Sequence, residues 1–183
     1  MRAPTIALLV LATAVSAAPR VQPTPVKTAV AVKPSGFRAE FVEDLDDVQD
    51  KITQLATAMP AEKYSWRPAP GVRSAGEVFM HIAGGNYFLA TFVGAQPPAD
   101  LPKDLERITD KAAVLSEMKR SFDHLRRVIA AESDADLEKS VNLFGKPVTH
   151  RYVFTTILNH LHEHLGQSIA YARMNGVVPP WSR

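Results

Sequence analysis

The apolar residues of this chain recur every three or four positions along several long stretches, and this spacing most restricts how it can fold. Between residues 37 and 55 the series is Phe37, Phe41, Leu45, Val48, Ile52 and Leu55. Such spacing places apolar side chains on one face of an α-helix. Acidic residues occupy most of the other side between residues 43 and 50. We therefore expect an amphipathic helix whose carboxylates form a solvated face and not a cation site.

Three further stretches show the same periodicity. One begins at Ser74, which forms a capping-box pattern with Glu77, and runs on through Phe92 to end before Gly94. The next begins near Thr109 or Asp110, and we expect its core stripe to be Ala112, Leu115, Met118, Phe122, Leu125 and Ile129. The last spans about 149–174. Four helices follow from these patterns, and segment 137–148 is interpreted as an irregular connection or a short hairpin.

The N-terminal residues have the pattern of a secretion signal. Arg2 precedes an apolar stretch from Thr5 to Val15, and small residues follow it up to Ala18. This stretch is shorter than the roughly 20 residues that span a bilayer, as is every later one, so we expect no membrane span after signal removal. We predict a signal peptide over 1–18, a proline-rich linker over 19–36, one domain over 37–183, and export to the periplasm or medium. An apolar tail or an uncleaved anchor is the alternative.

Composition limits the chemistry. The chain has no cysteine, which excludes a disulfide framework, a lipid-anchored cysteine and a thiolate nucleophile or ligand. Its net charge of +2 comes from interleaved acids and bases, so nothing resembles a nucleic-acid-binding surface. A metal site in this chain must use histidines and carboxylates.

Histidines in two predicted helices offer such a site. His160 and His164 are four residues apart, which places two imidazoles on one helix face, about 5–6 Å apart at Cβ. His81 is a third candidate ligand, whereas His162 points away from the pair and is expected to be exposed. Leu161 follows His160, so the His-Glu-x-x-His motif of zinc peptidases is absent. On spacing alone, His160 and His164 could also be unrelated helix residues.

Two glycines follow His81 by three and four residues and should share its helix face. Gly84 and Gly85 each cost about 1 kcal/mol relative to Ala inside a helix. They either make room for a metal-bound water and a substrate, or allow a neighbouring helix to pack closely. The patterns leave both interpretations open. His124, beside the stripe of the third predicted helix, is expected to be a structural, hydrogen-bonded residue.

Four short motifs occur in order along the chain: Trp66-Arg67-Pro68-x-Pro70-Gly71, Ser74-x-x-Glu77-x-x-x-His81, His160-x-x-x-His164-x-Gly166-Gln167 and Arg173-x-Asn175-Gly176-x-x-Pro179-Pro180. Together they resemble the DinB family of metal-binding helical-bundle proteins, from about residue 37 to the C-terminus. The resemblance implies an all-α, four-helix bundle with a long irregular connection before the last helix. It also implies that His81, His160 and His164 bind a divalent ion, commonly zinc or nickel, and dimers are common in the family.

The family resemblance leaves the reaction open. Its characterised members include thiol-dependent transferases and isomerases, and many others are described as metal-dependent hydrolases. Many members have arginine after the third histidine, where this chain has Leu165, so a role of that arginine does not carry over.

Three histidines leave a coordination position for water or substrate. We predict an exported, metal-dependent hydrolase that acts on a small molecule, because the thiol cosubstrates of the transferases are mainly cytoplasmic. The alternatives are a non-catalytic zinc- or nickel-binding protein, a metal-dependent thiol transferase, and a bundle whose histidines are structural. Glu163 is the candidate catalytic base, although an exposed or ligand-supporting role fits the sequence equally well.

Overall fold

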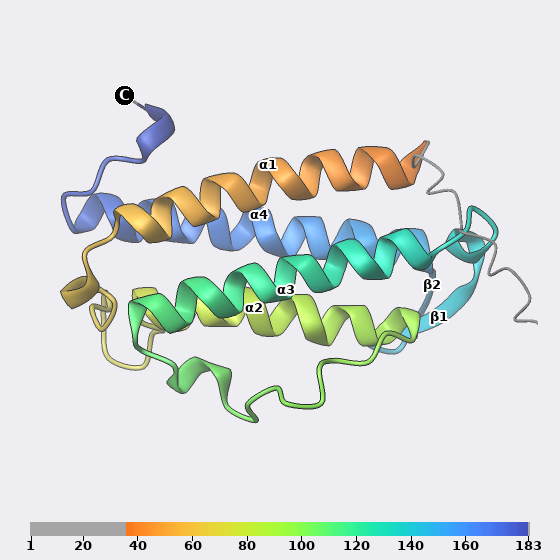
Figure 1. Ribbon diagram of the computed structural model, residues 1–183, viewed down its shortest axis with the longest axis horizontal. Coiled ribbons are helices and arrows are strands. Elements are labelled where there is room, and N and C mark those ends of the chain that lie inside the picture. The colour runs from red at the N-terminus through yellow and green to blue at the C-terminus, as the bar shows by residue number, and fades with distance from the viewer. Residues whose placement is uncertain (1–35, 183) are drawn as a thin grey trace, which may run out of the picture. The chain divides into compact units, whose positions relative to one another are not determined.

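Four helices make up most of the computed structural model, which describes residues 36–182. The helices are α1 (Phe37–Ala58), α2 (Ala75–Ala90), α3 (Lys111–Ala131) and α4 (His150–Met174). They lie side by side as a bundle (Figure 1), and the predicted all-α, four-helix architecture is confirmed. The predicted signal peptide and, apart from Gly36, the predicted linker lie outside the described residues.

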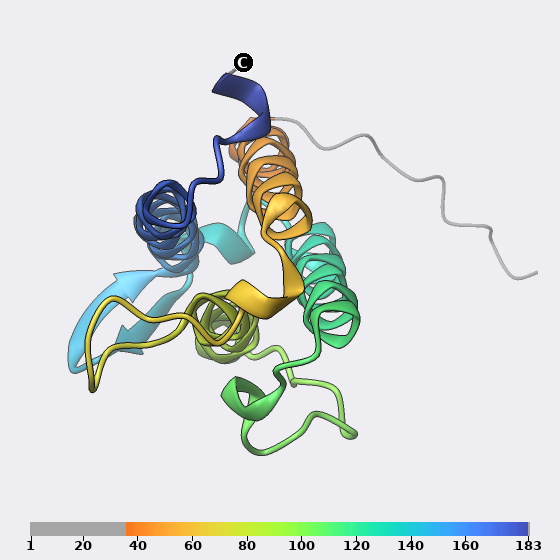
Figure 2. The same cartoon turned by 90° about the vertical axis from the view of Figure 1, so that its left-hand side faces the viewer.

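Each helix contacts two others. α1 and α2 both pack against α3 and against α4, so α1 and α2 face each other across a diagonal of the bundle (Figure 2). The predicted stripe of α1 is buried from Phe41 to Leu55, and Phe41 meets Phe154 of α4 edge-on with ring centroids 5.0 Å apart. The acidic residues of α1, from Glu43 to Asp50, are exposed, as expected of a solvated face.

Helices α2 and α3 run in the same direction, and this orientation requires a long connection. The segment between them, which we call the return segment (residues 91–110), runs back along the outside of the bundle (Figure 1). It begins with a 3₁₀ turn at Thr91–Val93, so the α-helix ends at Ala90, slightly earlier than predicted. A second 3₁₀ turn, Leu105–Arg107, contacts α2. The return segment thereby places side chains beside α2.

Helix ends follow the local sequence signals. The Glu77 amide donates to Ser74 Oγ at 3.3 Å and the Ser74 amide donates to Glu77 Oε2 at 2.6 Å, which confirms the predicted capping box. Asp110 caps α3 by accepting from the Ala113 amide, and the helix begins where predicted, near Thr109 or Asp110. The predicted α3 stripe is wrong at its first position, because Ala112 is exposed and Val114 is the first buried apolar residue. Ala112 lies about 120° round the helix from Met118, whereas Val114, in the same first turn of α3, lies only about 40° from it.

The connection before α4 is more regular than predicted. A 3₁₀ turn, Asp136–Glu138, leads into an antiparallel hairpin of β1 (Ser140–Leu143) and β2 (Lys146–Thr149). Of the two interpretations of segment 137–148, the hairpin is the one that the structure contains. Its loop has two residues, Phe144 with φ 51° and Gly145 with φ 87°, the signs that define a type I′ turn.

Among residues 36–182, no helix combines the length and the apolar character that crossing a bilayer requires.

Candidate metal centre

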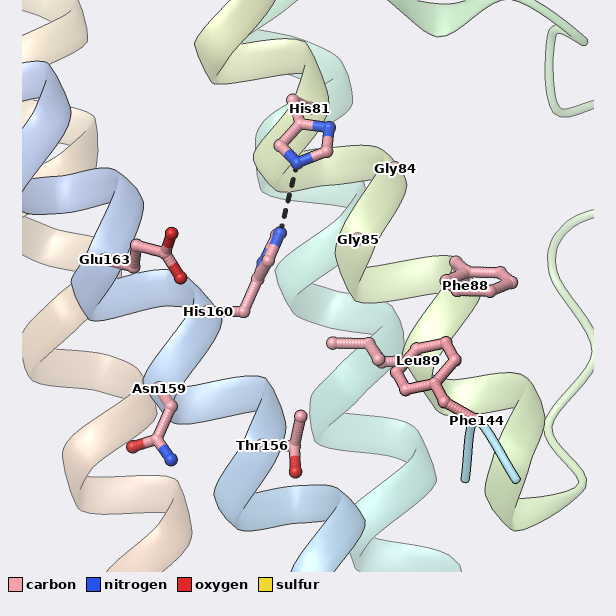
Figure 3. A pocket seen from close by; sticks show the side chains of 10 residues that line it. All are labelled: His81, Gly84, Gly85, Phe88, Leu89, Phe144, Thr156, Asn159, His160 and Glu163. Atoms are coloured by element: carbon pink, nitrogen blue, oxygen red, sulfur yellow. Dashed lines mark hydrogen bonds between the residues drawn. The ribbon is translucent and has the colours of Figure 1, made fainter. Parts of the chain in front are cut away.

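The three candidate histidines come together where α2 and α4 pack against each other. His81 stands on α2, and His160 and His164 stand on successive turns of α4. One nitrogen from each ring lies within 4.8 Å of the other two, and all three side chains are half-buried. Figure 3 shows the His160 ring directed at His81 across the gap between the helices. His162 is exposed on α4, as expected, and does not join the cluster.

Oxygen acceptors fix the tautomers of two of these histidines. His81 Nδ1 lies 3.1 Å from Glu106 Oε1, and His164 Nδ1 lies 2.8 Å from Gln167 Oε1. A carboxylate oxygen and an amide oxygen only accept hydrogen bonds, so each Nδ1 carries the proton and donates it. The lone pair of each Nε2 is then free for a metal ion.

The spacing of the ring nitrogens fits a tetrahedral ion. Nε2 of His81 and Nε2 of His160 are 3.4 Å apart (Figure 3). An ordinary N–H···O hydrogen bond is shorter, at about 2.7–3.2 Å. Two nitrogens bound to one tetrahedral zinc at about 2.05 Å are about 3.3 Å apart. Within residues 36–182 no fourth histidine or acidic side chain belongs to the group, so the three histidines would leave one coordination position of a tetrahedral ion for water or substrate.

Burial keeps His81 and His160 in the protonation state that metal binding needs. It lowers the pKa of His160 to about 4, and the nearby His164 and His81 add to the effect because their positive charges would repel a third. Burial also lowers the pKa of His81, helped by Arg73, whereas Glu106 opposes the shift. Both imidazoles are therefore neutral near pH 7 and offer lone pairs.

Glu106 and Arg73 support the cluster from outside it. The Arg73 Nε donates to both carboxylate oxygens of Glu106 at 3.0 Å, and Glu106 in turn accepts from His81. Carboxylates behind metal-bound histidines orient the ring and raise its basicity. Neither residue was singled out by sequence patterns, because Glu106 lies on the return segment and Arg73 precedes the helix cap.

The two glycines of α2 have different surroundings. A Cβ at Gly85 would lie 2.2 Å from Cε1 and 2.9 Å from Nδ1 of His160, whereas a Cβ at Gly84 would meet only Leu105 Cδ1, at 3.7 Å. Close packing therefore explains Gly85, and the group packed against it is the imidazole of His160 itself. Gly84 borders open space.

A cavity of about 540 Å³ lies beside the cluster, between α2 and α4. His81, His160 and both glycines line one end of it (Figure 3). The candidate base Glu163 also lines the cavity, and Figure 3 shows its side chain leaving α4 on the same side of the helix as that of His160. Glu163 is exposed to solvent, so the structure places it at the rim and not in the interior.

The remaining histidine of interest, His124, lies on α3 and takes no part in the cluster. It is buried, with only 7% of its surface exposed, and its ring packs near that of Tyr87. The Nε2 atom of its ring has no hydrogen-bond partner among the described residues, so this atom does not supply the hydrogen bond that we expected of His124.

Comparison with known sequences gives the family. The sequence profile described as the DinB superfamily matches residues 44–168, which include all three clustered histidines. The chain belongs to the DinB superfamily.

Solved structures agree on the fold of this DinB protein. A DinB-like protein from Bacillus cereus aligns with a TM-score of 0.68 and 20% identity, covering 76% of this chain and 93% of the other. A DinB-like protein from Bacillus subtilis aligns with a TM-score of 0.60 and 21% identity, covering 75% and 92%. At these identities the likeness shows the shared fold.

One relative has a different description. The chaperone protein TorD of Escherichia coli is 31% identical over 140 residues, which are 73% of this DinB protein and 65% of TorD. The chain thus spans less than two thirds of the length of that relative.

Proposed function

We propose that this DinB protein is a metal-dependent hydrolase that acts on a small molecule, with the ion held by His81, His160 and His164. One observation carries the proposal. Three imidazole nitrogens lie within 4.8 Å of one another, and two of the three rings, those of His81 and His160, line a cavity of about 540 Å³. Cavities of about 300–1,000 Å³ are typical of small-molecule sites.

Each group of the site would have its own role in metal binding or in the reaction. A bound divalent ion would supply Lewis acidity and lower the pKa of a bound water. Glu106 holds the His81 ring with Nε2 toward the cluster, and Gly85 lets the His160 ring approach α2. Glu163, at the rim of the same cavity, is the group to which we assign proton transfer.

Zinc or nickel is the ion we propose, since neutral imidazoles suit both and availability decides between them. We prefer catalysis over metal storage for the following reason. A storage site should fill every coordination position with protein ligands, whereas no fourth side chain of the described residues joins this cluster. Export remains part of the proposal, on the pattern of residues 1–18, and so does a homodimer, on the family resemblance.

Metal content tests the site. Purified protein is analysed by plasma mass spectrometry beside His160→Ala and a matched control, His162→Ala, which removes an exposed histidine from the same helix. We expect about one zinc or nickel per chain in the parent and the control, and little in His160→Ala. Equal metal in all three proteins, or none in any after incubation with zinc, would contradict the site.

Turnover tests the activity. Zinc-loaded protein is assayed against a panel of aryl and alkyl esters and amides, beside Glu163→Gln and His160→Ala. We expect hydrolysis that is lost in His160→Ala and falls about 10²-fold or more in Glu163→Gln, the usual effect of a general base. Stoichiometric metal without any hydrolysis would instead favour the non-catalytic or thiol-transferase alternatives.

A further inference from the structure

The cavity beside the histidines has two unlike sides. Thr156, Asn159 and Glu163 line it from α4, and all three are polar. Phe88, Leu89 and Phe144 line it from α2 and from the hairpin loop, and all three are apolar (Figure 3). A molecule in this cavity would therefore meet the metal ligands at one end and a wall of hydrocarbon along one side.

Phe144 is an unexpected residue for its position. It is the first residue of the two-residue hairpin loop, with φ 51°, and 66% of its surface is exposed. Type I′ loops favour Asn, Asp or Gly at this point, and a bulky side chain with positive φ is uncommon. Neither the loop geometry nor burial in the core accounts for a phenylalanine here.

Phe144 belongs to a group of three rings that we call the mouth aromatics (Phe88, Phe92 and Phe144). The ring of Phe144 lies 5.1 Å from that of Phe92 and 6.1 Å from that of Phe88, centroid to centroid. Phe88 and Phe92 meet edge-on at 5.4 Å. Phe88 is also 54% exposed, so two large apolar rings stand in solvent beside the cavity. Exposed apolar groups gathered at a cavity mark binding sites.

Charge at the cavity restricts what binds there. Glu163 is the one acidic side chain among the residues that line it. No lysine or arginine belongs to the lining. Away from the metal ligands, a phosphate or carboxylate group on the bound molecule would find no cationic side chain in this lining.

We propose that the substrate carries a neutral, planar apolar group, such as an aromatic ring, which lies against Phe88 and Phe144 while its hydrolysable group reaches the metal. This inference rests on the proposed function, which supplies the metal. The mouth aromatics select the apolar group, and the histidine cluster holds the reacting end.

Two hydroxamates test it, because both bind zinc through the same group and differ only in the attached apolar part. Binding of acetohydroxamate and of 2-naphthohydroxamate to zinc-loaded protein is measured by calorimetry. We expect the naphthyl compound to bind at least about tenfold more tightly, from burial of its ring. In Phe144→Asn that advantage should fall below about threefold, with acetohydroxamate unaffected.

The variants separate folding from binding. Asn suits the type I′ loop, so Phe144→Asn should keep the melting temperature of the parent. Met174→Ser is the matched control, since Met174 is 63% exposed and lies outside the cavity lining, and we expect it to leave both affinities unchanged. Zinc content is measured for every protein.

The outcomes distinguish the two proposals. Zinc-loaded protein that binds neither hydroxamate, or protein that takes up no zinc, overturns the proposed function and this inference with it. Acetohydroxamate binding without a naphthyl advantage, or an advantage that survives in Phe144→Asn, overturns only the inference. An equal loss of both ligands in Phe144→Asn also overturns it, because Phe144 would then support the metal site and not the apolar group.

Discussion

Replacing Gly85 by alanine should abolish tight metal binding although the residue is not a ligand. The new Cβ would lie 2.2 Å from Cε1 of His160, whereas ordinary contacts begin at 3.4 Å. The imidazole must therefore move by more than about 1 Å. Metal–ligand distances tolerate only about ±0.2 Å, so His160 could no longer share an ion with His81 and His164.

The size of the effect can be worked out from this displacement. Changes that merely disturb the support of a ligand cost about 10–100-fold in affinity, so displacing the ligand itself should cost at least about 100-fold. At saturating zinc, a 100-fold loss removes about 2.7 kcal/mol of zinc-dependent stabilisation. For a domain of this size that is about 5–10 °C in melting temperature. Without zinc, the helix propensity of alanine offsets much of the overpacking, so the change should stay within about 2 kcal/mol.

Gly84→Ala provides the matched control, because its Cβ would meet only Leu105 Cδ1 at 3.7 Å. That variant should gain up to about 1 kcal/mol and keep its zinc affinity. Chelator competition gives the zinc affinities, and thermal melts with and without zinc give the stabilities. The reasoning would be refuted by a Gly85→Ala protein whose zinc affinity lies within about threefold of the parent.

Three further predictions concern the support of the site and the fold. Glu106→Gln removes the carboxylate behind His81 and should weaken zinc binding about tenfold in chelator competition, and an unchanged affinity would mean that the contact does not act on the metal. Ser74→Ala removes the capping-box acceptor and should lower the free energy of unfolding by about 1 kcal/mol in urea titrations, an estimate that a loss under about 0.3 kcal/mol would contradict. Metal-free protein should lose stability as the pH falls from about 6.5 towards 4. In this range His160 binds a proton in the unfolded chain but not in the folded chain, where its pKa is lowered to about 4. His160→Gln should flatten that slope, and an equally steep slope in the variant would exclude His160 as its cause.

Local patterns predicted what depends on local geometry. The stripe of α1, the Ser74 cap and the shared face of His160 and His164 follow from helix periodicity, and the structure contains all of them. Ala112 shows the limit of the method, since each step of three residues drifts about 60° round the helix, and two such steps separate Ala112 from Met118.

Long-range geometry could not be read from the sequence in the same way. The position of His81 beside the α4 pair came from the family resemblance and not from spacing. Glu106 lies on an irregular segment whose path depends on α2 and α3 running in the same direction, which no local pattern encodes. The role of Gly85 depends on the approach of a ring from another helix, so its two interpretations could be separated only in three dimensions.

The metal ligands and Phe144 come from different parts of the fold, and this difference affects how such a protein can acquire new substrates. The histidines stand on helices, and the residues next to them along each helix are buried in the bundle. Phe144 stands on a two-residue loop, and about two thirds of the surface of this side chain is in solvent. Substitutions in that loop do not change the core. Substrate selectivity can therefore change during evolution, or in a library randomised at Phe144 and Phe88, while the metal ligands stay the same.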